Sequence, residues 1–234
     1  LKSGRRLGCQ AKVTGDVVID VPLESQVHKQ VVRKAASDRV VTMDPATKLY
    51  FVHVEEPDMH EPTGDLERLS KALKDQWNID SVTCDLRNLG KLQRTLRRGN
   101  WKITVALFKD HKAEAPKIVN CWPKLHEAGI YGLAIDLGST TVAAHLTDLE
   151  SGAVIASSGI MNPQIRFGED LMSRVSYSMM NPGGDSEMTK SIREAINVLV
   201  SDISKEVNVA HDLILEVVFV CNPVMHHLLL GIDP

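Results

Sequence analysis

The sequence has no closely spaced pair of cysteines. Its four cysteines lie far apart among 234 residues, at Cys9, Cys84, Cys121 and Cys221. This spacing excludes a zinc knuckle and a disulfide framework, and it predicts a reducing, cytoplasmic setting. No apolar run has the length of a membrane span, and no charged segment followed by an apolar one opens the chain. Because the first residue is Leu1 rather than Met, we expect the chain to be an internal fragment of a longer protein.

The chain also lacks a strong excess of either charge. Its formal net charge is −3, with 27 basic and 30 acidic residues. Nucleic acid and anionic membrane surfaces attract proteins with an excess of positive charge, which this chain does not have. We therefore expect neither as a partner. With 43% hydrophobic residues, the chain is long enough to bury a sizeable core in two domains.

One stretch, residues 132–146, carries the clearest chemistry. An apolar run ends at Asp136, a Gly-Ser-Thr-Thr tetrad follows, and apolar residues resume after it, which predicts a strand, a tight turn and a second strand. We expect Gly138 to adopt a positive φ and to let N–H groups converge on a phosphate. The hydroxyls of Ser139, Thr140 and Thr141 would add to this cradle, and Asp136 would hold a hydrated Mg²⁺. The alternative from these residues alone is an ordinary hairpin with a solvated Asp.

The segment Ile-Asp-Leu-Gly-Ser-Thr-Thr, residues 135–141, resembles the first phosphate motif of the superfamily that holds actin, sugar kinases and Hsp70 ATPases. The resemblance implies a ribonuclease H-like domain in which this turn joins the first two strands. It also implies that the backbone of the turn touches the β- and γ-phosphates of ATP.

The start of the chain carries a second resemblance. Residues 6–11, Arg-Leu-Gly-Cys-Gln-Ala, precede an expected strand pair that turns at Gly15-Asp16, and together they resemble the last piece of a plant-type 2Fe–2S ferredoxin domain. Cys9 would be the fourth cluster ligand. The other three cysteines, which the family places upstream at C-x₄-C-x₂-C spacing, are absent here, and one thiolate cannot hold a cluster alone.

The middle of the chain predicts a small α/β layer. Residues 25–37 are polar and are expected to be a linker, and residues 113–130 to be a hinge. Between them, in residues 38–112, hydrophobic periodicity predicts four strands and two amphipathic helices. The strands are expected at 39–43, 48–54, 81–86 and 101–109, and the helices at 63–77 and 89–98.

The last part, residues 131–234, predicts the order β-β-β-α-α-β-α. After the phosphate turn, strands are expected at 142–149 and 153–161, and a helix is expected to start at 168–175. A longer helix begins at Asp185 and runs to about Glu206, a buried strand covers 215–221, and a last helix follows.

The combination resembles one family, the ATP-dependent reductive activators of corrinoid proteins. The segments that carry this resemblance are residues 62–69, 101–105, 168–175 and 225–234, in addition to the Cys9 region. The family joins a 2Fe–2S domain, a linker, a middle domain and an actin-like ATPase domain in this order. The implied fold class is therefore α/β, with residues 1–24 ending a ferredoxin-like domain, a mixed-sheet middle domain at 38–112, and an incomplete ribonuclease H-like domain at 131–234.

The implied function is transfer of one electron from a 2Fe–2S cluster to the Co(II) corrinoid of a methyltransferase partner, driven by ATP, to regenerate Co(I). Asp136 would position Mg²⁺ and residues 138–141 would hold the phosphates. Arg166, Asp170 and Arg174 are weaker candidates near that entry. The chain alone is expected to be inactive, the electron donor is not indicated, and a homodimer stays open.

Two alternatives of other classes remain at this point. A sugar-kinase-like phosphotransferase would share the phosphate hairpin but should have no ferredoxin tail, so the Cys9 region argues against it. A non-catalytic interaction module would use the hairpin only as structure, and a protein of that kind would ignore nucleotide.

Overall fold

The structure is a computed structural model that describes residues 12, 14–16, 18, 42–60 and 62–234. By its internal contacts the chain divides into two units, 1–30 and 31–234. Cys9, most of the expected strand pair around Gly15-Asp16 and the linker 25–37 lie outside the described residues. The expected strand at 39–43 lies largely outside them too, and residues 42 and 43 are not in a strand. Both sheets of the described structure belong to the second unit.

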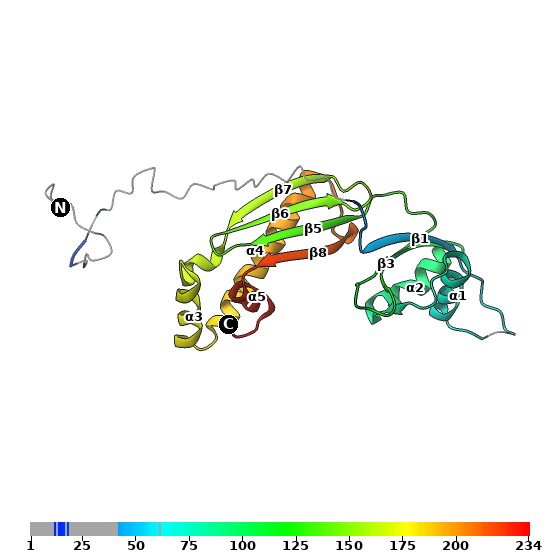
Figure 1. The fold of residues 1–234 in the computed structure, drawn as a ribbon, viewed down its shortest axis with the longest axis horizontal. Helices are drawn as coiled ribbons and strands as arrows, with labels where there is room; N and C mark the ends of the chain where they lie inside the picture. The colour runs from blue at the N-terminus through cyan, green and yellow to red at the C-terminus, as the bar shows by residue number, and fades with distance from the viewer. Residues whose placement is uncertain (1–11, 13, 17, 19–41, 61) are drawn as a thin grey trace. The chain divides into compact units, whose positions relative to one another are not determined.

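The first sheet of this unit combines three antiparallel strands with one short parallel strand (Figure 1). Its strand order is β1-β3-β4-β2, in which β3 pairs antiparallel with β1 and β4, and β2 runs parallel to β4. The bounds are β1 Thr47–His53, β2 Thr83–Cys84, β3 Lys102–Phe108 and β4 Lys117–Pro123.

Strand β4 lies inside residues 113–130, where the sequence predicted a hinge. Its buried residues include Ile118, Asn120 and Cys121, so the segment belongs to the first sheet rather than to a connection. The polar Asn120 obscured the apolar pattern on which a strand prediction depends. The number of strands in this layer is four, as expected, but β4 takes the place of the strand expected at 39–43.

Two amphipathic helices cover the first sheet, α1 at Asp65–Trp77 and α2 at Leu86–Arg98. The Gly64 N–H donates to Glu67 Oε2 at 2.9 Å at the start of α1, and Asp85 accepts the Asn88 N–H at 2.9 Å at the start of α2. Each fully buried leucine of these helices contributes about 1.5–3 kcal/mol. The shared core contains Leu69, Leu73, Leu92 and Leu96 from the helices and Val52, Ile103, Val105 and Ile118 from the strands.

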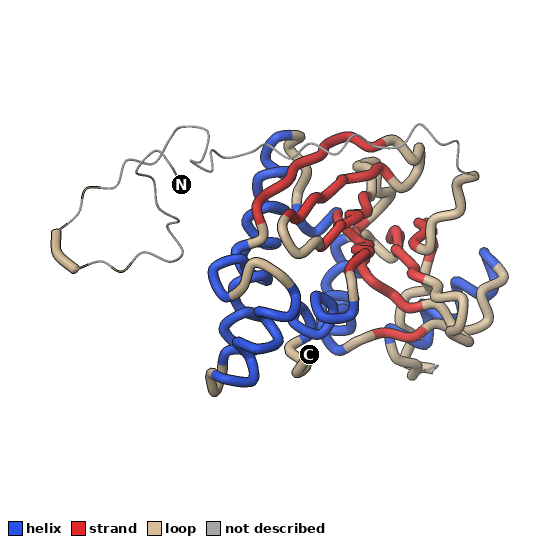
Figure 2. Tube along the Cα trace, turned by 60° about the vertical axis from the view of Figure 1, so that its left-hand side comes forward, coloured by secondary structure: helices blue, strands red, loops and turns tan. Residues whose placement is uncertain are grey.

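The second sheet is a meander with one parallel strand added, in the order β7-β6-β5-β8 (Figures 1 and 2). Strands β5, β6 and β7 pair antiparallel, and β8 pairs parallel with β5. The element order is the predicted one, β-β-β-α-α-β-α, with short 3-10 turns added. The bounds are β5 Tyr131–Leu137, β6 Thr141–Asp148, β7 Val154–Met161, η3 Pro163–Phe167, α3 Leu171–Met180, α4 Gly184–Glu206, η4 His211–Leu213, β8 Ile214–Cys221 and α5 Pro223–Leu230.

Helix α4 covers one face of the second sheet. Alternate residues of β5 and β6 point to this side, and the helix supplies a stripe at a spacing of three and four residues. This side is the second core of the unit, and the mixed α/β architecture matches the predicted fold class. Its buried members include Leu133, Ile135, Leu137, Val142, Ala144 and Leu146 from the strands and Ile192, Ile196, Leu199 and Ile203 from α4.

Strand β8 differs from its prediction. The sequence predicted a buried strand, because Val217, Val218, Phe219 and Val220 are apolar without alternation. In the structure β8 is an edge strand, and the exposed fractions of Val218 and Val220 are 58% and 67%. The prediction of burial was wrong because Val218 and Val220 lie on the face of the sheet away from α4, which no described element covers over β8.

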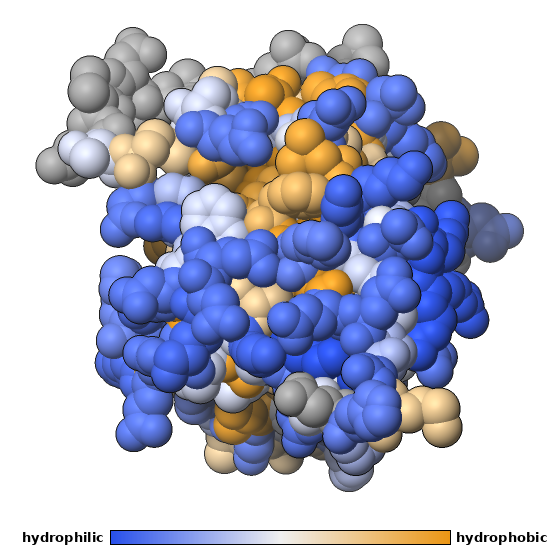
Figure 3. Space-filling model, turned by 90° about the vertical axis from the view of Figure 1, so that its right-hand side faces the viewer, coloured by the Kyte–Doolittle hydropathy of each residue, from blue (hydrophilic) through white to orange (hydrophobic). Residues whose placement is uncertain are grey.

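The surface on the side of α1 and α2 is mostly hydrophilic, with hydrophobic side chains gathered in a smaller area (Figure 3). This distribution fits helices that bury one stripe and expose charged residues on the other. Among the residues that the structure describes, no helix combines the length and the apolar character needed to cross a membrane.

Candidate functional site

The turn between β5 and β6, residues 138–141, lies where the sequence predicted a phosphate cradle. Asp136 is half-buried near the end of β5, opposite Ala143 of β6 and Val220 of β8. Its neighbours Ile135 and Leu137 belong to the core under α4. Because successive residues of a strand point to opposite faces, Asp136 lies on the face away from α4.

Glycine at position 138 is required by a close approach, not by a positive φ. The prediction of a positive φ was wrong, since the described glycines with positive φ are Gly152, Gly183 and Gly231. A Cβ on Gly138 would lie 2.8 Å from the carbonyl oxygen of Thr141, closer than real contacts allow. The same two residues are joined by a bond from Gly138 N–H to Thr141 O of 2.9 Å. The turn is therefore too tight for any side chain here.

The carbonyl groups of the turn are all engaged by structural donors. The Asn162 side-chain amide donates to Gly138 O and the Asn162 N–H donates to Thr140 O, both at 2.8 Å. The Arg174 guanidinium donates to Ser139 O, and Thr141 O accepts the Gly138 N–H. These four bonds fix the orientation of the peptide groups in the turn.

That orientation leaves two N–H groups available. In a trans peptide the N–H points away from the C=O of the same unit. With the Gly138 and Ser139 carbonyls held by Asn162 and Arg174, the N–H groups of Ser139 and Thr140 point away from these donors. Within the described residues neither N–H has a backbone acceptor. Two adjacent N–H groups that point out of a turn can bind an anion.

The turn also carries three hydroxyl groups. Thr140 is exposed, and Ser139 and Thr141 are half-buried. A hydroxyl can donate to a phosphate oxygen or accept from a metal-bound water. The predicted residues Asp136, Gly138, Ser139, Thr140 and Thr141 are thus brought to one end of the second sheet.

Arg174 lies in α3 and donates to the turn, and its side chain is completely buried. Its Nε donates to Gly168 O at 3.0 Å, and its Nη1 lies 3.1 Å from the sulfur of Met225 in α5. Removal from water lowers the pKa of the Arg174 guanidinium, and Asp170 partly opposes this effect. Gly168 must be small here, because a Cβ would lie 2.8 Å from the Arg174 backbone nitrogen.

Asn162 and Gln164 belong to the site, although the sequence did not indicate a role for them. Asn162 is 1% exposed and its side chain accepts the Gln164 N–H at 2.9 Å, while Gln164 Nε2 donates to Met188 O of α4 at 3.0 Å. The Asn-Pro pair at 162–163 was the available signal, because Asn is a preferred residue before a helical turn with Pro at its first position. Its second role, donation to the turn, depends on a contact 24 residues away along the chain.

The other two weak candidates do not contact the turn. The Arg166 guanidinium lies over the Phe167 ring, 4.6 Å from its centroid. Asp170 caps the start of α3, where its carboxylate accepts the Ser173 N–H at 2.7 Å, and this bond is the main cause of its lowered pKa. Of Arg166, Asp170 and Arg174, only Arg174 has a direct bond to the turn.

The described residues do not fit an iron–sulfur cluster. Cys121 is buried in the first core and Cys221 ends β8, while burial raises the pKa of the Cys84, Cys121 and Cys221 thiols. A cluster needs four thiolates in one place. No three His, Cys, Asp or Glu of the described part are grouped so that they could hold a metal ion. Cys9, the predicted ligand, lies outside it.

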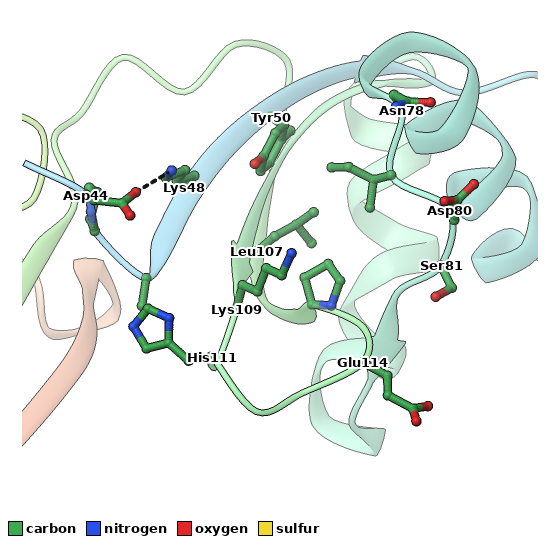
Figure 4. Close-up of a pocket in the computed structure, with 14 residues that line it drawn as sticks. Asp44, Lys48, Tyr50, Asn78, Asp80, Ser81, Leu107, Lys109, His111 and Glu114 are labelled. Carbon is green, nitrogen blue, oxygen red and sulfur yellow. Dashed lines mark hydrogen bonds and ion pairs between the residues drawn. The ribbon is translucent and has the colours of Figure 1, made fainter.

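A separate pocket lies at one end of the first sheet (Figure 4). It has a volume of about 700 Å³, and its lining includes Tyr50, Leu107 and Lys109. Asp44 and Lys48 form an ion pair of 2.8 Å at its rim, so this acid and this base largely neutralise each other. None of its lining residues belongs to the phosphate turn, and its mixed charge favours no particular anion.

Comparisons with known proteins agree with this division into two sheets. The sequence model of the RACo linker region matches residues 36–128, and that of the RACo middle region matches residues 131–234. The first range contains the first sheet and the second contains the phosphate turn.

Two relatives carry names that describe their activity. A corrinoid activation enzyme, RamQ of Eubacterium limosum, is 32% identical over 108 residues, which are 46% of this chain and 18% of that protein. A solved structure of a reductive activator for corrinoid, iron–sulfur protein matches with a TM-score of 0.71 and 29% identity, and the match covers 92% of this chain and 35% of that one. The chain therefore spans well under half of the length of both relatives. It belongs to the RACo family, of which it carries the linker and middle regions.

Proposed function

We propose that this chain is the linker and phosphate-binding part of an ATP-dependent reductive activator, which returns the Co(II) corrinoid of a methyltransferase partner to Co(I). The observation that carries the proposal is the turn 138–141, in which every carbonyl is engaged and two adjacent N–H groups point outward. The names of the two relatives supply the chemistry of the partner, a corrinoid protein.

The residues of the turn fit a Mg-nucleotide. The N–H groups of Ser139 and Thr140 would hold phosphate oxygens, and the missing side chain of Gly138 lets the turn stay tight. Asp136, on the face of β5 away from α4, would bind Mg²⁺ through water, because Mg²⁺ keeps most of its waters and takes few protein ligands. When bound, the nucleotide would supply the free energy of an otherwise unfavourable reduction, and closure around it would couple to docking of the corrinoid protein.

The electron would come from a 2Fe–2S cluster in another part of the longer protein. We propose Cys9 as one of its four ligands, and the described thiols take no part in it. An external donor must reduce this cluster. We infer a cytoplasmic location, because distant cysteines that remain thiols require a reducing compartment.

The chain alone should bind Mg-ATP weakly and should not hydrolyse it. Two backbone N–H groups in an open, hydrated turn contribute only about 0.5–1.5 kcal/mol each. Immobilising a nucleotide costs roughly 4–15 kcal/mol, which these bonds do not offset. Titration calorimetry with this chain tests the expectation, and tight binding would show that the nucleotide site lies elsewhere.

The decisive test uses the full-length protein that contains this chain. We expect Asp136→Ala to abolish ATP-dependent formation of Co(I), followed by the corrinoid absorption spectrum, and to slow steady-state phosphate release. The matched control is Asp202→Ala, which removes an exposed carboxylate of α4. Unchanged phosphate release with Asp136→Ala would mean that the hairpin is only structural, as in an interaction module. Phosphate transfer to a sugar hydroxyl, without corrinoid reduction, would favour a sugar-kinase-like enzyme.

The proposal for Cys9 has a separate test. Reconstituted full-length protein should show 2Fe–2S absorption with Cys9 intact and should lose it with Cys9→Ser. Cys84→Ser is the control, because this thiol lies in β2 of the first sheet. Equal cluster content with and without Cys9 would refute the ligand assignment while leaving the nucleotide site untouched.

A further inference from the structure

Arg174 is the charged donor among the side chains that hold the carbonyl groups of the turn 138–141. Its Nη2 donates to the carbonyl of Ser139, inside the phosphate turn, while its Nε and Nη1 contact Gly168 and Met225. We propose that Arg174 is a positioning residue for phosphate, which aims and strengthens the Thr140 N–H and adds a positive charge behind it. This inference rests on the proposed function.

The first step concerns one peptide unit. Ser139 C=O and Thr140 N–H belong to the same planar trans group, so a donor fixed on the oxygen also fixes the direction of the N–H. A charged donor withdraws electron density from the carbonyl and makes the N–H on the other side a better donor. The neighbouring unit, Gly138 C=O with Ser139 N–H, is held by the neutral amide of Asn162 instead. Thr140 should therefore be the stronger phosphate donor of the two.

The second step concerns the charge itself. The Arg174 side chain is 0% exposed. Its guanidinium donates to two backbone carbonyls, the Gln164 side-chain oxygen and a thioether sulfur. Among the described residues it forms no ion pair. Asp170, the acid that acts on it, is engaged with the Ser173 N–H at the start of α3. An arginine stays charged in a protein, and a buried charge without a counter-ion is costly. An anion bound on the other side of the Ser139–Thr140 peptide would offset that cost.

The competing explanation is that Arg174 only ties loops together. In that case any substitution that preserves folding would leave phosphate binding unchanged. The two explanations differ in the response of a single amide and in the effect of restoring the charge. Arg193 provides a matched control, because its Nε donates to Leu229 O at 2.9 Å, again a backbone carbonyl, but between α4 and α5.

The experiment titrates inorganic tripolyphosphate into the ¹⁵N-labelled chain and follows the Ser139 and Thr140 amide signals. In the wild type we expect both to move, Thr140 further. Arg174→Met should weaken binding about tenfold, since ~1.4 kcal/mol corresponds to a factor of ten, and should reduce the Thr140 response more than the Ser139 response. Arg174→Lys should recover part of the affinity, and Arg193→Met should behave as the wild type. Circular dichroism confirms that each variant is folded.

Equal tripolyphosphate affinity in folded Arg174→Met and wild type would overturn the inference. If that substitution unfolds the chain, the wild type still decides, because a larger response of Ser139 than of Thr140 contradicts the role given to Arg174. The failure of the proposed function gives a different result. In that case neither amide responds to tripolyphosphate, and Asp136→Ala leaves phosphate release by the full-length protein unchanged.

Discussion

Replacement of Gly138 by alanine tests how tightly the phosphate turn is built. The new Cβ would lie 2.8 Å from Thr141 O, so the turn must open and the 2.9 Å bond between Gly138 N–H and that oxygen must weaken or break. Loss of such a bond costs about 0.5–1.5 kcal/mol, and overpacking against fixed backbone costs about 1–3 kcal/mol. Alanine recovers about 0.4–1 kcal/mol by restricting the unfolded chain. The net expectation is a loss of ~1–3 kcal/mol in the free energy of unfolding.

Gly90→Ala is the matched control for this substitution. Gly90 lies in the exposed part of α2, and nothing lies within 4 Å of a Cβ built on it. The same chemical change should therefore stabilise the chain by about 0.5–1 kcal/mol, because alanine is the better helix former. Urea unfolding followed by far-ultraviolet circular dichroism measures both variants.

Hydrogen exchange with mass spectrometry then locates each effect along the chain. Peptides that cover β5, the turn and β6 should exchange faster in Gly138→Ala, whereas those from α2 should exchange more slowly in Gly90→Ala. If Gly138→Ala is as stable as the wild type and its turn exchanges at the same rate, the close approach to Thr141 does not constrain the turn. The reasoning about its N–H groups would then fail too.

Three further predictions concern other positions in residues 131–234. Asp148→Asn should lower stability above about pH 5. Hydrogen bonds to the Asp148 carboxylate, first from the Ser151 N–H, lower its pKa below the unfolded value of about 3.9. The carboxylate therefore stabilises the folded chain at higher pH, and this contribution is lost as the pH falls through the pKa of the folded state. Urea unfolding at several pH values measures this dependence. Asn162→Ala should destabilise the chain by about 2 kcal/mol, measured by urea unfolding, because two side-chain bonds are lost. Val220→Lys should reduce self-association measured by light scattering, because Val220 lies on an exposed apolar face of an edge strand; unchanged association would mean that β8 does not mediate it.

The sequence was sufficient to predict those helices, strands and turns that depend on residues close together in the chain. The apolar runs on either side of the Gly-Ser-Thr-Thr tetrad predicted the turn between β5 and β6, and the spacing of leucines predicted α1 and α2 within a few residues. These features follow from hydrophobic periodicity and from turn residues, which act over a few positions. The element order of residues 131–234 was confirmed for the same reason.

The donors that shape the turn could not be predicted in this way. Asn162 and Arg174 reach the turn from 24 and 35 residues away. Arg174 was named only as a candidate near the nucleotide entry, and nothing near either residue in the sequence indicates its bond to the turn. A buried arginine on a helix resembles any exposed arginine until the helix is packed. The steric need for glycine at position 138 could not be predicted from nearby residues either, because the distance to Thr141 O depends on how the whole hairpin closes.

Strand β8 shows a different limit of sequence patterns. Four consecutive apolar residues indicate a strand that favours cover on both faces, and burial of each valine would contribute about 1.5–3 kcal/mol. The pattern describes what the strand prefers, whereas the structure shows which elements actually lie against it. Here β5 pairs with one edge of β8, and Val218 and Val220 are exposed on the same face of the sheet as Asp136. Since Asp136 lies beside Val220 in the pairing of β5 with β8, whatever covers this apolar strand also lies next to the proposed Mg²⁺ position. Cover of β8 and closure of the nucleotide site would therefore be coupled, which is a physical reason for the chain alone to hold ATP weakly.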